Sequence, residues 1–194
     1  MTHAASPSLS VVRGKLVVVS GPSGVGKGAV LNRLRREVPG LWISTSVTTR
    51  PPRPGEVDAE RYRFVDDESF DRLLTRGDLL ESNEFDGHRY GTPKAPVLDR
   101  LAKGRLVILE LDPEGALRLR PSFPTARLIF LAPPSWEELS RRLAKRGTES
   151  DEVIRRRLTI ARKELMLQPR FDRVLVNDSV DAVVGELVSE VLAP

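Results

Sequence analysis

The stretch GPSGVGKGAV, residues 21–30, follows directly on the apolar run KLVVVS, residues 15–20. Short β-branched runs of this kind are typical of buried parallel strands. The helix expected over residues 28–38 has apolar side chains at helical spacing, namely Val30, Leu31, Leu34 and Val38. Strand, glycine-rich loop and helix in this order predict a phosphate-binding loop, in which backbone N–H groups surround an anion and Lys27 reaches its oxygens.

The loop lacks the hydroxyl residue that usually follows its lysine. Gly28 and Ala29 stand at the two positions after Lys27. A hydroxyl there usually contacts Mg²⁺. Since the anion site consists mainly of backbone N–H groups and Lys27, we expect phosphate binding to survive this loss.

Composition narrows the class of protein. The chain has 194 residues, with 40% hydrophobic and 30% charged, which fits one globular domain. No apolar run approaches the roughly 20 residues of a membrane span, so we expect a soluble protein. Zero cysteines exclude disulfides and thiolate sites, and two histidines disfavour zinc.

Charge and the N-terminal segment bear on partners and location. The net charge of +4 is spread over several segments among 27 acidic residues, so we expect no nucleic-acid partner. Residues 1–13 are small and polar and lack the features of a secretory signal, which predicts a disordered tail and a cytoplasmic protein.

The rest of the chain alternates between strand and helix patterns. An α/β fold with a parallel sheet flanked by helices and right-handed crossovers is therefore predicted. Further strands are expected at 105–111, 125–132 and 173–177, and helices at 68–77, 94–104, 113–120, 136–147, 151–168 and 180–192. Residues 41–92 are expected to form a small, mostly β insert, with β patterns at 41–49 and 62–65 and a hairpin over 79–92 that turns at Asp86-Gly87.

Polar residues outside the loop suggest a second anion site. Arg50 and Arg53 lie on a proline-stiffened loop, where they form either a fork around one phosphate or an exposed basic loop. Glu110 and Asp112 end an apolar run two residues apart and are expected on one face, at the edge of the sheet where ligands bind. The alternative for Asp112 is a structural pair with an arginine.

The sequence resembles the guanylate kinase family of bacterial type. The motifs GPSGVGKG, TTRPPRPGE, Glu81 with YGT, ELD, APPSWEEL, RGTE and VND occur in the family's order over residues 15 to about 192. The resemblance implies a fold of the P-loop NTPase type and one domain over 14–194 behind the 1–13 tail. Its core would be 14–40, 93–140 and 168–194, with a GMP-binding insert at 41–92 and a lid at about 141–167.

The resemblance also implies the reaction and its residues. ATP would phosphorylate GMP or dGMP, in purine metabolism, with Mg²⁺ bound through ATP and water and no direct protein ligand. ATP-binding residues would be Gly21, Pro22, Ser23, Gly24, Val25, Gly26, Lys27, Gly28 and Asn177, the last beside adenine. Ser46, Arg50, Arg53, Tyr62 and Tyr90 would hold the GMP phosphate. Glu81, Thr92 and Asp112 would lie at the base, with Asp112 there or near the metal's water shell. Catalytic residues would be Lys27 and three arginines that arrive with lid closure, Arg142, Arg146 and Arg157.

Departures from the family pattern keep two alternatives open. Ala59 stands where the family usually has glycine, and Ser82-Asn83 replace the usual Trp-Ala. The alternatives are a catalytically weak binding module that keeps the fold, and a P-loop kinase for another small phosphate ester.

Overall fold

The computed structural model describes residues 14–53, 55–85, 87–144 and 151–192. The predicted tail at 1–13 and Asp86 of the predicted turn lie outside the described residues. So do residues 145–150, which include Arg146.

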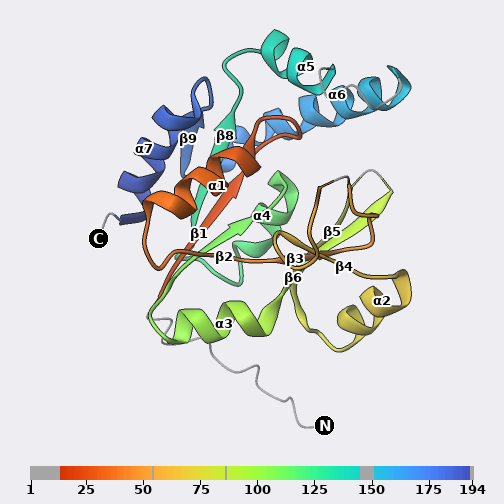
Figure 1. The fold of residues 1–194 in the computed structure, drawn as a ribbon, viewed down its shortest axis with the longest axis vertical. Coiled ribbons are helices and arrows are strands. Elements are labelled where there is room, and N and C mark those ends of the chain that lie inside the picture. Colours follow the sequence, from red (N-terminus) through yellow and green to blue (C-terminus); the bar gives the residue numbers. More distant parts are fainter. Residues whose placement is uncertain (1–13, 54, 86, 145–150, 193–194) are drawn as a thin grey trace.

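A five-stranded parallel sheet forms the centre of the molecule (Figure 1). Its strand order is β2-β7-β1-β8-β9, and each neighbouring pair is parallel. The strands are β1 (Lys15–Ser20), β2 (Trp42–Ile43), β7 (Leu106–Glu110), β8 (Arg127–Ala132) and β9 (Arg173–Val176). The predicted fold class, a parallel sheet flanked by helices, is confirmed.

Helices cover both faces of this sheet. The helices on one face are α1 (Lys27–Glu37), α5 (Trp136–Ala144), α6 (Asp151–Met166) and α7 (Val180–Leu192), and those on the other are α3 (Lys94–Ala102) and α4 (Pro113–Leu119). Alternate side chains of β1 enter the two cores: Val17 and Val19 face α1 and α7, whereas Val18 faces α3 and α4. Within the described ranges, no helix is long and apolar enough to cross a membrane.

A second, four-stranded sheet lies beside the first (Figure 1). Its order is β4-β3-β6-β5, from β3 (Ser46–Thr48), β4 (Tyr62–Phe64), β5 (Leu79–Phe85) and β6 (His88–Pro93), with α2 (Asp67–Thr75) between β4 and β5. Strands β5 and β6 are antiparallel, which confirms the predicted hairpin. The 3₁₀ helix η1 (Gln168–Arg170) connects α6 to β9.

The continuous β pattern predicted at 41–49 is wrong as a single strand. Residues 42–43 pair with β7 in the central sheet, and residues 46–48 pair with β4 and β6 in the second. The Ser44 N–H donates to the Ile108 carbonyl at 2.9 Å, and the Ser46 N–H donates to the Arg61 carbonyl at 3.1 Å. The chain therefore passes from one sheet to the other at Thr45, and only the residues from Ser46 onward build the second sheet.

Ala59 adopts a backbone conformation that favours glycine. Its φ is 63°, and among the described residues other than glycine it alone has a positive φ. Its N–H donates to the Tyr62 carbonyl at 2.8 Å, which closes the turn into β4. A Cβ in this region costs about 1 kcal/mol or more, so this departure from the family pattern stores strain beside the predicted GMP site.

Replacing Ala59 by glycine should relieve this strain. We expect Ala59→Gly to raise the free energy of unfolding by about 1 kcal/mol, measured by denaturant titration. Ala182→Gly, at an exposed position of helix α7, is the control and should lower it by about 0.5–1 kcal/mol. Destabilisation by both substitutions would contradict the strain at Ala59.

Candidate functional site

The glycine-rich loop joins the end of β1 to the start of α1. Gly21, Gly24 and Gly26 all have positive φ, so the loop reverses direction in conformations that other residues rarely adopt. At Gly21 a Cβ would lie 2.3 Å from the Leu131 carbonyl oxygen of β8, which leaves no room for a side chain. The sheet thus fixes the loop, and α1 begins directly after it without a side-chain cap, which suits its N-terminal N–H groups to bind an anion.

Lys27 and Ser23 of this loop bond to protein groups. The Lys27 ammonium donates to the carbonyls of Gly21 and, at 3.2 Å, of Pro22. The Ser23 N–H donates to the carboxylate of Glu164, a buried residue of α6, at 3.2 Å. Burial raises the pKa of Glu164, against the opposing effect of Lys27. A carboxylate is therefore already placed where the loop offers N–H donors to an anion.

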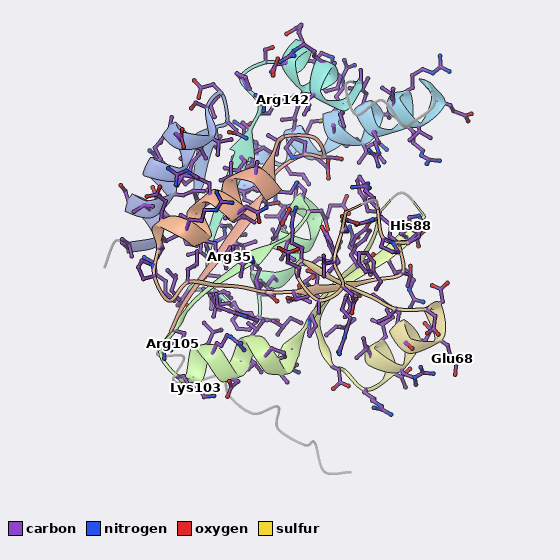
Figure 2. All side chains as sticks on the ribbon, viewed as in Figure 1. Arg35, Glu68, His88, Lys103, Arg105 and Arg142 are labelled. Atoms are coloured by element: carbon purple, nitrogen blue, oxygen red, sulfur yellow. The ribbon has the colours of Figure 1, made fainter. Side chains whose placement is uncertain are left out.

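Asn177 and Arg142 hydrogen-bond to the backbone of the glycine-rich loop. The buried Asn177 amide donates to the Val25 carbonyl at 2.7 Å. The Arg142 guanidinium, labelled on α5 in Figure 2, donates to the carbonyls of Val25 at 3.2 Å and of Asn177 at 3.1 Å. Neither residue lines the cavity described next, so the structure gives both a role in positioning the loop. Their predicted contacts with adenine and phosphate stay predictions.

A cavity of about 350 Å³ extends from the loop to the second sheet. It brings together these predicted site residues: Pro22, Ser23, Gly24, Gly26, Lys27, Gly28, Ser46, Arg50, Arg53, Tyr62, Glu81, Tyr90, Asp112 and Arg157. Gly21 and Thr92 hydrogen-bond to two residues of the cavity wall, Lys27 and Glu81. Val25 belongs to the loop, and its carbonyl accepts from Asn177, which lies outside the wall. Segments far apart in the chain thus form one site.

Arg50 lies in the loop that follows β3, where Glu56 holds its side chain. Its guanidinium is buried and donates to both carboxylate oxygens of Glu56, at 2.8 and 3.0 Å. It also lies 5.4 Å from the ring centroid of Tyr62. Burial acts to lower the pKa of Arg50, but bonding to Glu56 and the proximity of Tyr90 raise it overall. The guanidinium is therefore fixed in place and charged.

Glu56 also organises the loop that carries Arg53. Its carboxylate accepts from the Arg53 N–H at 2.7 Å, while the Arg53 side chain is exposed at the cavity edge. Burial acts to raise the pKa of Glu56, but its bonds to Arg50 and Arg53 lower it overall. The two predicted phosphate-binding arginines thus share one carboxylate, a connection that the sequence does not reveal.

Glu81 and Asp112 meet at the far end of the cavity. Glu81 accepts from the buried Thr92 hydroxyl at 2.7 Å. Asp112 caps α4 by accepting from the Gly115 N–H at 2.9 Å. A Cβ at Gly115 would lie 3.0 Å from one Glu81 oxygen and 3.1 Å from one Asp112 oxygen, so the two carboxylates converge on this glycine. Burial, with a contribution from Asp112, raises the pKa of Glu81 to about 7.

Sequence reasoning missed Arg61, which lies in the cavity wall next to Tyr62. Its guanidinium donates to the Glu110 carboxylate at 2.5 Å. Arg61 thus pairs with Glu110, two residues before Asp112, whose carboxylate accepts from the Gly115 N–H. Burial, with a contribution from Glu110, raises the pKa of Tyr62, which keeps its hydroxyl protonated as a donor.

Comparisons with known proteins agree on one family. The model of the guanylate kinase family matches residues 13–193. A guanylate kinase of Thermobifida fusca is 59% identical over 93% of this chain and 92% of its own length, and one of Streptomyces coelicolor is 54% identical over 95% and 93%. The crystal structure of guanylate kinase from Anaplasma phagocytophilum superposes with a TM-score of 0.79 at 32% identity, over 93% of this chain and 85% of that one.

The raised pKa of Glu81 makes the stability of the protein depend on pH. The folded chain holds this proton up to about pH 7, whereas 4.5 is the ordinary value of the group. Stability is therefore lost as pH rises between these values. On going from pH 4.5 to pH 8, the free energy of unfolding of Glu81→Gln should rise relative to that of wild type by about 3 kcal/mol.

Denaturant titration at the two pH values measures this gain. Glu84→Gln, at an exposed position of the same strand, is the matched control. An equal gain in both variants would contradict the assignment to Glu81.

Proposed function

The chain belongs to the guanylate kinase family, and we propose how the residues of its cavity carry out the reaction of that family. ATP donates its γ-phosphoryl group to GMP, and ADP and GDP are the products. A GMP phosphate oxygen forms the new P–O bond, and the bond to the bridging oxygen of ADP breaks with its electron pair. The acceptor is already an anion, so the step needs no general base.

The observation that carries this proposal is the single cavity that joins the glycine-rich loop to Arg50 and Glu81. We assign the loop and Lys27 to the phosphates of ATP. Arg50 and Arg53 take the phosphate of GMP together with Ser46, Tyr62 and Tyr90, because a guanidinium fork matches phosphate oxygens. The phosphate of GMP would replace Glu56 as the partner of Arg50, and the phosphates of ATP would draw Lys27 away from the loop carbonyls.

Glu81 is proposed to select guanine. Guanine presents adjacent N1–H and N2–H donors that one carboxylate accepts together, whereas adenine presents an acceptor at N1. A buried acceptor without a donor is costly, which gives strong rejection of the wrong base. Thr92 holds one oxygen of Glu81 at 2.7 Å. Asp112 lies beside Glu81, so we assign it to the base rather than to the water shell of the metal.

Mg²⁺ is proposed to enter with ATP and to neutralise charge on the phosphates. Within the described ranges, no group of three or more His, Cys, Asp or Glu could hold a metal ion. The side chains after Lys27 offer no oxygen, and Glu110 is engaged by Arg61. We therefore propose that the ion is held by phosphate oxygens and water.

The lid arginines complete the proposal. Arg157 is buried and lines the cavity, so we assign it to the transferring phosphoryl group. Arg142 is assigned to the phosphates after lid closure, together with Arg146.

We further propose that the protein acts in the cytoplasm, where its two dissolved nucleotide substrates occur, and requires no nucleic-acid or membrane partner.

A substrate panel tests the proposed function. Purified protein is incubated with Mg²⁺ and ATP, and ADP release is measured with GMP, dGMP, AMP, UMP or CMP as acceptor. We expect turnover with GMP and dGMP and little with the other three. Tight GMP binding without ADP release would indicate a binding module, and preferential use of AMP would refute the role of Glu81.

Position 29 tests the consequence of the missing hydroxyl. Ala29 is exposed, lines the cavity and stands in the first turn of α1. We expect Ala29→Thr to lower KM for ATP about fivefold through one added hydrogen bond, with KM for GMP less affected. Ala29→Val adds the same bulk without a hydroxyl and is the control. Equal KM values for ATP in the two variants would show that the hydroxyl contributes nothing here.

A further inference from the structure

Arg61 occupies the junction between the two halves of the site. It immediately precedes β4 in the second sheet, yet its guanidinium donates at 2.5 Å to Glu110, at the end of β7 in the central sheet. Its backbone carbonyl accepts from the Ser46 N–H at 3.1 Å. The side chain is 37% exposed and lines the same cavity as Lys27 and Arg50. A cation is thus fixed between the loop and the proposed GMP phosphate site.

The guanidinium also fills the volume that a side chain at position 28 would take. A Cβ at Gly28 would lie 2.2 Å from one terminal nitrogen of Arg61 and 2.7 Å from its central carbon. Gly28 has no positive φ, so its backbone does not require glycine. The constraint at this position is therefore the space taken by Arg61, directly after Lys27.

Opposite charges in the cavity keep this cation in place without a bound anion. The Glu110 carboxylate pairs with Arg61 in the same way that Glu56 pairs with Arg50. Burial acts to lower the pKa of Arg61, but Glu110 raises it overall, so the side chain stays charged. A fixed cation stabilises charge that develops on a transferring phosphoryl group, because it needs no reorganisation at the moment of reaction.

We propose that Arg61 is a further catalytic residue of this chain, whose guanidinium contacts the phosphoryl group in transit between ATP and GMP. Because Gly28 has no side chain, it leaves room for the guanidinium of Arg61 to make this contact. This inference rests on the proposed function and adds to it a residue from outside the loop, the TTRPPRPGE segment and the lid.

Removal of the guanidinium tests the proposal. We expect Arg61→Gln to lower kcat about 100-fold while KM for ATP and GMP changes much less, as for loss of a single donor to the transition state. Arg61→Lys should recover part of kcat, because it restores the charge without the fork. Arg63→Gln, at an exposed position on β4, is the matched control and should match wild type. Thermal unfolding of each variant reports whether the fold is kept.

A second substitution displaces the guanidinium without removing it. Gly28→Ala places a methyl group where the flexible end of Arg61 lies, so the arginine must move. We expect kcat to fall, and the double variant with Arg61→Gln to be no slower than Arg61→Gln alone, because the two changes remove the same contact. Gly185→Ala, in helix α7 with no atom within 4 Å of the added Cβ, is the control.

Binding of a bisubstrate ligand separates this inference from the proposed function. The probe is adenosine joined to guanosine through five phosphates, titrated by calorimetry. Wild type should bind it more tightly than Arg61→Gln, and as tightly as Arg63→Gln. If wild type neither phosphorylates GMP nor binds the probe, both the proposed function and the inference are wrong. If wild type phosphorylates GMP and binds the probe, but Arg61→Gln equals Arg63→Gln in kcat and affinity, the inference alone is wrong. The inference alone is also wrong if the losses of kcat caused by Gly28→Ala and Arg61→Gln multiply in the double variant.

Discussion

Repulsion between like charges is the constraint on which this site depends. Among the described residues, five cationic side chains line one cavity of about 350 Å³, and they come from the glycine-rich loop, the segment between β3 and β4, and α6. Five carboxylates line the same cavity and bring its charge into balance. Arg50 and Arg61 each have a carboxylate within 3 Å, and Glu164 lies close enough to Lys27 to be affected by its charge. The protein can therefore hold cations together before a nucleotide supplies phosphate charge.

The same pairing links the two sheets. Glu110 is at the end of β7, and Arg61 immediately precedes β4, so their ion pair joins the central sheet to the second one. At the far end of the cavity, the carboxylates of Asp112, after β7, and Glu81, on β5, converge around Gly115. Residues assigned to GMP thus come from both sheets, and their relative position depends on these few polar contacts.

The elements that local pattern determines could be predicted from the sequence. The run KLVVVS, the glycines after it and the apolar spacing of α1 predict the loop, and Asp86-Gly87 predicts the hairpin of β5 and β6. The break between β2 and β3 could not be predicted, because Ser44 and Ser46 bond to partners that lie far away in the sequence. The β-branched pattern is continuous across both strands, and only the tertiary contacts divide it.

The residues of the candidate site could likewise be predicted only in part from the sequence. Family motifs led to Lys27, Arg50 and Glu81, and the cavity brings these residues together. Arg61 has no local signal, since its significance depends on Gly28 and Glu110 in two other segments. The family motif predicts that Asn177 contacts adenine, and its amide also donates to the Val25 carbonyl of the loop, a contact that no spacing in the sequence indicates.

The shared volume of Gly28 and Arg61 has an evolutionary consequence. A Cβ at position 28 and the guanidinium of Arg61 cannot occupy their present positions together, so a side chain at position 28 would displace the end of Arg61. Substitutions at the two positions should therefore be correlated among related chains, with a hydroxyl residue at 28 accompanied by a shorter or uncharged residue at 61. In this chain, a cation from a distant segment thus lies beside the position where the usual loop hydroxyl would stand.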